Sequence, residues 1–147
     1  MAAAEAPQLL LHIVARGKIG RSPEAELVER YLQRINWPTK LTELAERAAL
    51  PAAPRGNVTV LLDEKGEALS SMELARKLEQ WRDRGAREAR FVIGAAGGHS
   101  PEERAGANLL LSFGAATWPH LLVRAMLAEQ LFRATSILAN HPYHREG

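Results

Sequence analysis

Short apolar runs alternate along the chain with longer segments whose apolar residues recur at helical spacing. The runs are rich in Leu, Ile and Val, as in strands that are buried on both faces of a sheet. We expect strands at residues 9–15, 39–45, 58–62, 90–94 and 109–113, with a short sixth piece at residues 117–118. Because strands and helices alternate throughout, the pattern predicts an α/β fold with a mostly parallel sheet flanked by helices.

Four helices are predicted, three of them from residues that typically begin a helix. Ser22, which is followed by proline, has the pattern of an N-cap and a first helical position. Ser70 and Glu73 form a capping box, in which each side chain binds a free backbone N–H group of the first turn. Ser100 begins a shorter helix in the same way, and apolar residues at helical spacing predict the last helix over residues 120–138.

The composition fits one globular domain without disulfide bonds. The chain has 147 residues, of which 24% are charged, and no cysteine. We expect a single domain over residues 9–147, with residues 1–8 as a flexible N-terminal tail. The lack of cysteine excludes disulfides, thiolate metal sites and a cysteine nucleophile.

One uncharged stretch, residues 105–123, is long enough to raise the question of a membrane span. It contains Gly114 and Pro119, which would change the backbone direction inside a bilayer, so we interpret it as buried protein interior. At the N-terminus the acidic Glu5 occupies a place where a secretory signal needs positive charge. The sequence therefore predicts a cytoplasmic protein without a membrane anchor.

A basic loop follows the first predicted strand. The formal net charge of the chain is only +2, but Arg16, Lys18 and Arg21 lie together, with no acidic residue among them. Two glycines interrupt this loop, and three cations on a flexible loop would suit a nucleic-acid backbone. The alternative interpretation is an ordinary solvated loop.

Three further segments are candidates for chemistry. Glycines at residues 94–98 follow a strand directly, where an α/β sheet binds ligands; the alternative interpretation is a turn that permits tight packing. Residues 113–120 form a backbone-rich loop that suits a planar ring, or else a buried crossover. The tail at residues 141–145 contains two histidines, a tyrosine and an arginine, or is simply a polar chain end. No third ligand accompanies the two histidines, and we expect no metal site.

An ordered set of motifs in the second half of the chain resembles a known family. The set begins with Thr117-Trp118-Pro119-His120 and continues with Val123-Arg124, Glu129-Gln130, Phe132-Arg133-Ala134 and Pro142-Tyr143-His144-Arg145. Together with weaker matches that begin at Leu9, it resembles the RlmH family of large-subunit rRNA pseudouridine methyltransferases, within the SPOUT superfamily. The resemblance covers nearly the whole chain.

The resemblance implies a fold, a reaction and an assembly. The fold is a SPOUT-type sheet with a C-terminal trefoil knot, and the reaction is transfer of a methyl group from S-adenosylmethionine to N3 of a pseudouridine in 23S rRNA, on the large ribosomal subunit or the whole ribosome. The active protein would be a homodimer. By matched position, the cofactor-binding residues would be Leu62, Gly94, Phe113, Gly114, Ala115, Ala116, Thr117 and Trp118.

The same resemblance suggests roles for residues of the last helix and the tail. His144 or Tyr143 would favour loss of the N3 proton, with Glu129 as the alternative base. Arg145 and Arg124 would bind RNA phosphate or the developing negative oxygen. We expect Arg133 to join Arg16, Lys18 and Arg21 in binding RNA.

One departure from the family pattern leaves a second function open. Ala95 stands where the family has glycine, and its methyl group would lie beside the expected cofactor. The rival interpretations are a ribosome-associated RNA-binding protein that has kept the fold and lost catalysis, and an α/β domain that binds a different nucleotide.

Overall fold

The computed structural model describes residues 8–94, 98–140 and 143. Its centre is one five-stranded sheet in which every pair of neighbouring strands is parallel, in the order β2-β1-β4-β3-β5. The strands are β1 (Leu10–Arg16), β2 (Thr39–Leu44), β3 (Val58–Ala68), β4 (Glu88–Ile93) and β5 (Leu109–Ser112). Since parallel strands need crossover connections, the helices between them cover the sheet, as the alternating sequence pattern predicts.

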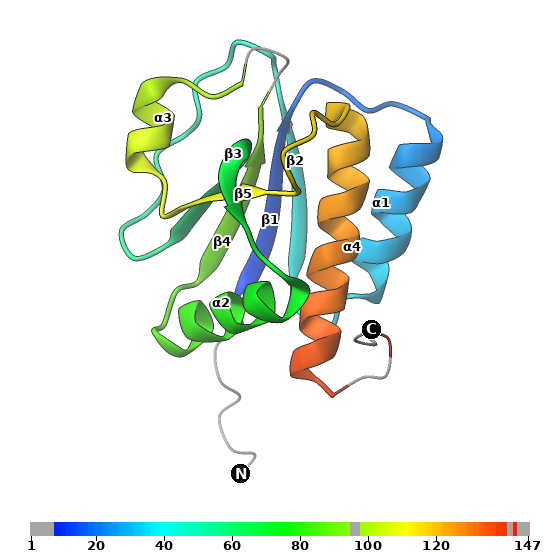
Figure 1. Ribbon diagram of the computed structural model, residues 1–147, viewed down its shortest axis with the longest axis vertical. Coiled ribbons are helices and arrows are strands. Elements are labelled where there is room, and N and C mark those ends of the chain that lie inside the picture. The colour runs from blue at the N-terminus through cyan, green and yellow to red at the C-terminus, as the bar shows by residue number, and fades with distance from the viewer. Residues whose placement is uncertain (1–7, 95–97, 141–142, 144–147) are drawn as a thin grey trace.

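The helices are α1 (Pro23–Arg34), α2 (Ser71–Asp83), α3 (Pro101–Gly106) and α4 (His120–Leu138). Figure 1 shows α1 and α4 side by side on one face of the sheet and α3 on the other. Ser22 caps α1 by accepting a hydrogen bond from the Ala25 N–H, at 3.1 Å. The predicted capping box at Ser70 is present, and Ser100 forms another with Glu103.

Both faces of the sheet are buried, as the apolar runs predict. On one face, Leu11 and Ile13 of β1 and Phe91 of β4 are fully buried in the main core with Leu127 and Leu131 of α4. On the other face a smaller core forms around Val14, Leu61 and Val92. The segment between β2 and β3 contributes Leu50 to this second core, which explains why a long connection lies there.

Strand β3 differs from the prediction, because it does not end at Leu62. It pairs with β5 twice, since Leu111 lies opposite Leu62 and again opposite Glu67. Residues 63–66 are therefore extra on the β3 side, as in an extended bulge. Pairing resumes because Gly66 has no side chain: a Cβ there would lie 2.5 Å from the backbone C and O of Leu110.

Two other predictions about the second half of the chain are wrong. Residues 117–118 form no strand and belong to an exposed loop. The uncharged stretch at 105–123 is not interior throughout, because residues 105–106, 108 and 115–120 are exposed. In the part of the chain that the structure describes, no helix has the length and apolar character needed to cross a membrane.

The close approach at Gly66 gives a stability prediction. Gly66→Ala places a methyl group against the β5 backbone, and we expect a loss of about 1–3 kcal/mol in the free energy of unfolding, as for other overpacked sites. The matched control is Gly106→Ala, because a Cβ at Gly106 meets no atom within 4 Å. Urea unfolding of both variants measures this. Equal midpoints would show that the contact between β3 and β5 accommodates a methyl group without loss of stability.

Candidate functional site

A cavity of about 530 Å³ opens at the carboxyl ends of β4 and β5, beside the bulge in the middle of β3. It is lined by the ends of these strands, by the bulge at residues 63–65 and by the loop between β5 and α4. Seven of the eight predicted cofactor residues line it: Leu62, Gly94, Phe113, Gly114, Ala116, Thr117 and Trp118. Ala115, the eighth, lies in the same loop but does not line the cavity. The carboxyl edge of a parallel sheet is where such folds bind ligands.

The loop from Phe113 to Trp118 is held by hydrogen bonds close to the cavity. The Ser112 hydroxyl accepts from the Gly114 N–H at 3.0 Å and donates to the Gly114 carbonyl at 2.7 Å. Gly114 has φ +110°, a conformation that favours glycine. The indole Nε1 of Trp118 donates to the Phe113 carbonyl at 3.3 Å, although 43% of Trp118 is exposed. The loop is therefore shaped in advance, with a large aromatic side chain at the cavity mouth.

The bulge of β3 forms the opposite rim of the cavity and is tied to the loop. Thr117 Oγ1 donates to Glu64 Oε2 at 2.6 Å. Next to it, the buried Asp63 carboxylate accepts from the Lys65 N–H at 2.9 Å, and its Oδ2 lies 2.7 Å from Arg104 Nη2. These contacts connect β3, α3 and the loop around a single opening. No sequence pattern predicts a role for Glu64 or Arg104 at this rim.

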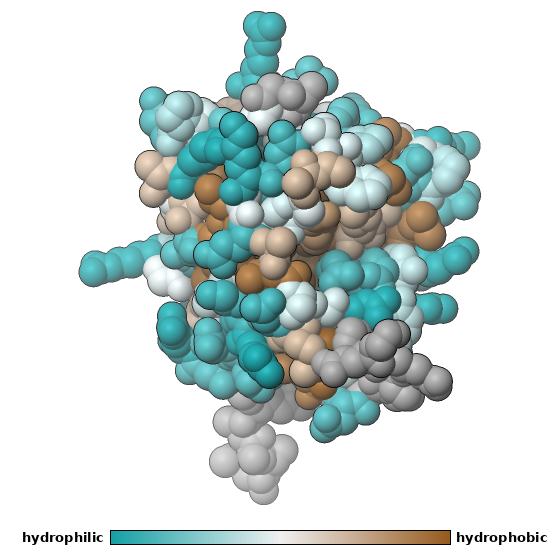
Figure 2. All heavy atoms as spheres, in the orientation of Figure 1, coloured by the Kyte–Doolittle hydropathy of each residue, from teal (hydrophilic) through white to brown (hydrophobic). Residues whose placement is uncertain are grey.

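A second cavity, of about 650 Å³, lies on the other side of Phe113 and Gly114. Apolar residues of α1 and α4, among them Leu27 and Met126, line it. Glu129, the predicted alternative base, lines it too. Figure 2 shows apolar residues in the middle of the face between β3 and α4, surrounded by hydrophilic ones. Glu129 is thus separated from the first cavity, which it does not line.

The Glu129 carboxylate is occupied by neighbouring donors. Arg133 Nη2 donates to Oε2 at 2.6 Å, as the i,i+4 spacing predicts, and the Gln130 amide donates to Oε1 at 3.0 Å. The Tyr143 hydroxyl donates to Oε2 at 2.9 Å. Burial, together with this hydrogen bond, raises the pKa of Tyr143 to about 12, so its hydroxyl stays protonated at neutral pH.

The remaining tail positions fall outside the described residues. His144 and Arg145, predicted to act in catalysis, are among them, as is Ala95, the predicted departure in the glycine segment. Tyr143 itself is well anchored, because its ring lies 4.5 Å from that of Phe132 between centroids and 4.9 Å below the Arg133 guanidinium.

Two of the predicted RNA-contacting or catalytic arginines are buried. Arg16 is 7% exposed, and its Nη2 donates to Glu103 Oε2 at 2.7 Å and to the Ala48 carbonyl at 3.1 Å. Arg124 is 1% exposed; it contacts Glu43 at 2.5 Å and donates to the Gly17 carbonyl at 2.8 Å. Neither arginine lines the first cavity. These positions do not suit direct contact with RNA, which a sequence pattern could not reveal.

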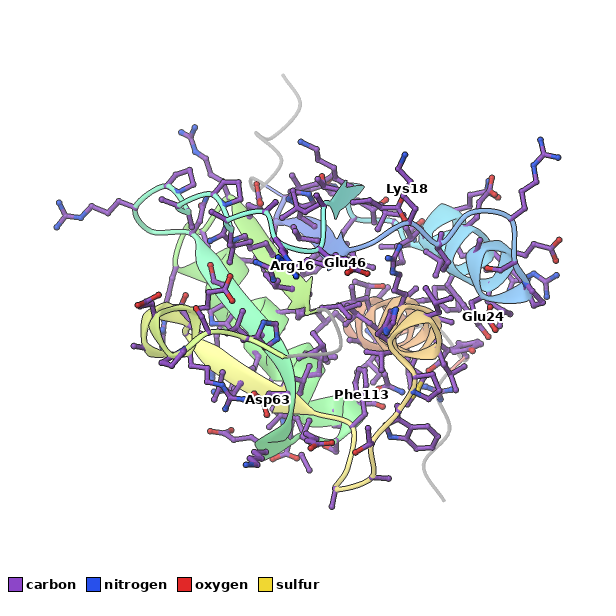
Figure 3. All side chains as sticks on the ribbon, turned by 90° about the horizontal axis from the view of Figure 1, so that it is seen from above. Arg16, Lys18, Glu24, Glu46, Asp63 and Phe113 are labelled. Carbon is purple, nitrogen blue, oxygen red and sulfur yellow. The ribbon has the colours of Figure 1, made fainter. Side chains whose placement is uncertain are left out.

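The other two cations of the basic loop, Lys18 and Arg21, are exposed. In Figure 3, which looks onto this edge of the sheet, Arg16 and Lys18 lie on one side and Asp63 and Phe113 on the other. The basic loop and the first cavity therefore open onto different halves of the same end of the molecule. Arg133, the fourth predicted RNA-binding residue, is half-buried and paired with Glu129.

Sequence reasoning missed His99, which lines the first cavity and is 8% exposed. Its only signal in the sequence is its place directly after the glycines. Within the described residues no cluster of three or more His, Asp or Glu side chains has the arrangement of a metal site. The lining of the first cavity combines glycines and apolar residues with a few polar and ionisable side chains, which suits an organic ligand.

Comparison with known proteins shows full-length relatives. Residues 9–144 match a family described as "Predicted SPOUT methyltransferase". A protein from Sphingopyxis alaskensis named Ribosomal RNA large subunit methyltransferase H is 64% identical over 140 residues, which are 95% of this chain and 99% of that protein. A protein of the same name from Erythrobacter litoralis is 67% identical and covers 95% of this chain and all of its own length.

A solved structure supports the fold alone. A probable methylase family protein from Haemophilus influenzae Rd KW20 superposes with a TM-score of 0.61 at 11% sequence identity. The match covers 92% of this chain and 70% of the other.

The pair of Glu43 and Arg124 predicts how stability depends on pH. The hydrogen bond from Arg124, joined by one from the Ile19 N–H, lowers the pKa of Glu43 below its ordinary 4.5. A carboxyl group with a lowered pKa stabilises the fold above its unfolded pKa, and the contribution disappears as the pH falls through the folded pKa. We expect Glu43→Gln to cost roughly 1.5–3 kcal/mol at pH 7, because it leaves the buried guanidinium without its counter-charge.

Unfolding by urea between pH 7 and pH 3.5 measures this. The difference between wild type and Glu43→Gln is expected to shrink below about pH 4.5, where the wild-type carboxylate also takes up a proton. The exposed Glu79→Gln on α2 serves as the control. A difference that stays constant over this range would show that Arg124 does not depend on the charge of Glu43.

Proposed function

The chain belongs to the RlmH family of SPOUT methyltransferases, and from this we propose that it methylates N3 of a pseudouridine in large-subunit rRNA with S-adenosylmethionine as donor. The name of its relatives supports rRNA of the large subunit as the substrate. The observation that carries the proposal is the first cavity, where seven residues expected from the family resemblance converge from three separate segments of the chain. The chain is a methyltransferase. Its methyl donor, its target atom and its base are what we propose.

The first cavity fits an adenosine-type donor. Its volume of about 530 Å³ falls in the range of roughly 300–1,000 Å³ that is usual for small-molecule sites. The glycine segment at its edge lacks the pattern of a phosphate-binding loop, which suits a nucleoside without phosphates. When bound, S-adenosylmethionine supplies a methyl group on a sulfonium that leaves readily. The chain therefore has to bind, orient and desolvate rather than to activate a leaving group.

The loop at residues 113–118 is proposed to hold the donor through its backbone. Its internal hydrogen bonds fix the direction of the backbone groups before any ligand binds, which lowers the entropic cost of binding. Thr117 and Glu64 close the loop against the bulge of β3. The trefoil knot that the family resemblance implies would involve this part of the chain, and it stays a prediction.

His144 is the base that we propose for removal of the N3 proton. Tyr143 is a poor base at neutral pH because its pKa is about 12, and Glu129 already accepts hydrogen bonds from three neighbours. Tyr143 instead fixes the start of the tail against α4, which leaves His144 and Arg145 to meet the RNA. A histidine suits this task because its ordinary pKa lies near neutrality.

The exposed cations Lys18 and Arg21 are proposed to contact RNA phosphate, with Arg133 nearer the tail. Arg16 and Arg124 stabilise the basic loop that carries these cations. Arg124 donates to the Gly17 carbonyl within the loop, and Arg16 at its start donates to Glu103. We further propose a homodimer that acts in the cytoplasm on the assembled ribosome or its large subunit. A dimer would double a cationic surface that is small in one chain.

Methyl transfer to ribosomes tests the proposal directly. We expect radiolabelled methyl from S-adenosylmethionine to appear in 23S rRNA of ribosomes that carry the pseudouridine without its N3 methyl group, and in no ribosomes that already carry the mark. Calorimetry with S-adenosylmethionine alone measures donor binding separately. Ribosome binding without donor binding or methyl transfer would favour the non-catalytic alternative.

Two tail variants separate the candidate bases. We expect His144→Ala to lower kcat by roughly 10²-fold or more, the usual contribution of a general base, with donor affinity unchanged. Tyr143→Phe keeps the ring contact with Phe132 and loses the hydroxyl with its hydrogen bonds to Glu129 and Tyr31, so we expect most of the activity to remain. Gln80→Ala on the exposed side of α2 is the control. The reverse ranking of the two tail variants would assign the base to Tyr143.

A further inference from the structure

His99 lies at the edge of the first cavity, between Leu62 of β3 and Gly94 after β4. It precedes α3, lines the cavity and is 8% exposed. Its Nε2 is 2.8 Å from the carbonyl oxygen of Leu62, at the end of the first half of β3. Its Cε1 is the atom nearest to the position that a Cβ of Gly94 would take, 3.1 Å away. The imidazole therefore packs between the bulge of β3 and the end of β4.

The bond to Leu62 determines which hydrogen-bonding group His99 has left. A carbonyl oxygen only accepts, so the proton lies on Nε2, and in the neutral ring Nδ1 is then an acceptor. Nδ1 is buried and finds no hydrogen-bond partner within residues 8–94, 98–140 and 143. A buried acceptor without a partner is unfavourable, and in native proteins such groups usually have a partner. Here a ligand in the cavity can supply that partner.

The surroundings of His99 favour a neutral donor over a charged one. The nearest part of the lining is apolar, with Ile93 and Leu111 beside Leu62. Two carboxylates close to His99 already have partners, because Glu103 pairs with Arg16 and Asp63 with Arg104, each at 2.7 Å. The other charged lining residues of the bulge, Glu64 and Lys65, are exposed to solvent. An ammonium or carboxylate of a ligand at Nδ1 would be buried without a counter-charge. A hydroxyl or amino group of a nucleoside carries no such penalty.

We propose that His99 is a binding residue for the nucleoside part of the methyl donor. Nδ1 accepts a hydrogen bond from a ribose hydroxyl or from the adenine amino group, while Nε2 holds the Leu62 carbonyl at the cavity edge. This inference rests on the proposed function, in which the donor occupies the first cavity. His99 then has two functions: it holds the edge of the cavity in place, and it binds the ligand.

Calorimetry with S-adenosylmethionine and with 5′-methylthioadenosine, which lacks the amino-acid part, tests the proposal. We expect His99→Leu to weaken both ligands by about 5–10-fold, the loss of roughly one hydrogen bond. His99→Asn, which can place an amide oxygen near the position of Nδ1, is expected to bind both ligands more tightly than His99→Leu. In steady-state assays KM for the donor should rise with kcat nearly unchanged. Gln80→Ala is the control, and thermal unfolding shows whether each variant is folded.

A measurement on the wild-type protein does not depend on how the variants fold. Long-range ¹H–¹⁵N spectra identify which imidazole nitrogen carries the proton. We expect the Nδ1 resonance of His99 to move upfield on addition of 5′-methylthioadenosine, as an acceptor does when it gains a hydrogen bond, with the proton remaining on Nε2. An unchanged resonance with ligand bound would overturn the proposal.

The outcomes also separate this inference from the proposed function. If wild type binds neither ligand, the donor site itself is wrong, and the role of His99 fails with it. If wild type binds both and folded His99→Leu binds them equally well, only the role of His99 is wrong. If His99→Leu weakens S-adenosylmethionine but not 5′-methylthioadenosine, Nδ1 faces the amino-acid part, and the assignment to the nucleoside is overturned.

Discussion

The passage of Gly66 against the backbone of β5 is the contact on which the site depends. A side chain there would lie 2.5 Å from the Leu110 carbonyl, so only glycine lets β3 rejoin β5 after residues 63–66. Residues 63–66 leave the ladder, and three of them, Asp63, Glu64 and Lys65, line the cavity. Glu64 then accepts the bond from Thr117 that joins the bulge to the loop after β5. The cavity is thus a consequence of how two parallel strands are paired.

A second constraint acts at the other half of the same edge, where two buried arginines hold loops rather than ligands. Burial alone would raise the pKa of Glu103, but hydrogen bonds from the Ser100 N–H and from Arg16 outweigh it, and the net pKa is lowered. Glu103 therefore joins the cap of α3 to the end of β1. Arg124 likewise joins α4 to the chain after β1 through the Gly17 carbonyl. Buried ion pairs contribute little net stability, but they require defined geometry.

These two constraints explain how a nearly neutral small domain fits the role of an RNA-modifying enzyme. Some of its positively charged side chains are buried in ion pairs, whereas Lys18 and Arg21 are exposed on the basic loop. The first cavity lies beside this surface, and the tail begins from α4 through the contacts of Tyr143. The sites that we propose for the donor, for RNA and for the base lie on three separate segments.

The sequence by itself determined the elements and their class. Apolar runs and caps predicted all five strands and all four helices, and α4 has the predicted bounds, because these signals depend on neighbours a few residues apart. The family resemblance also selected seven residues that line one cavity. Only the tertiary structure decided that β3 continues past Leu62, that Arg16 and Arg124 are buried, and that His99 faces the cavity. Each of these depends on contacts between residues far apart in the chain, and a basic or polar residue looks the same in sequence whether its partner is water, a carboxylate or a ligand.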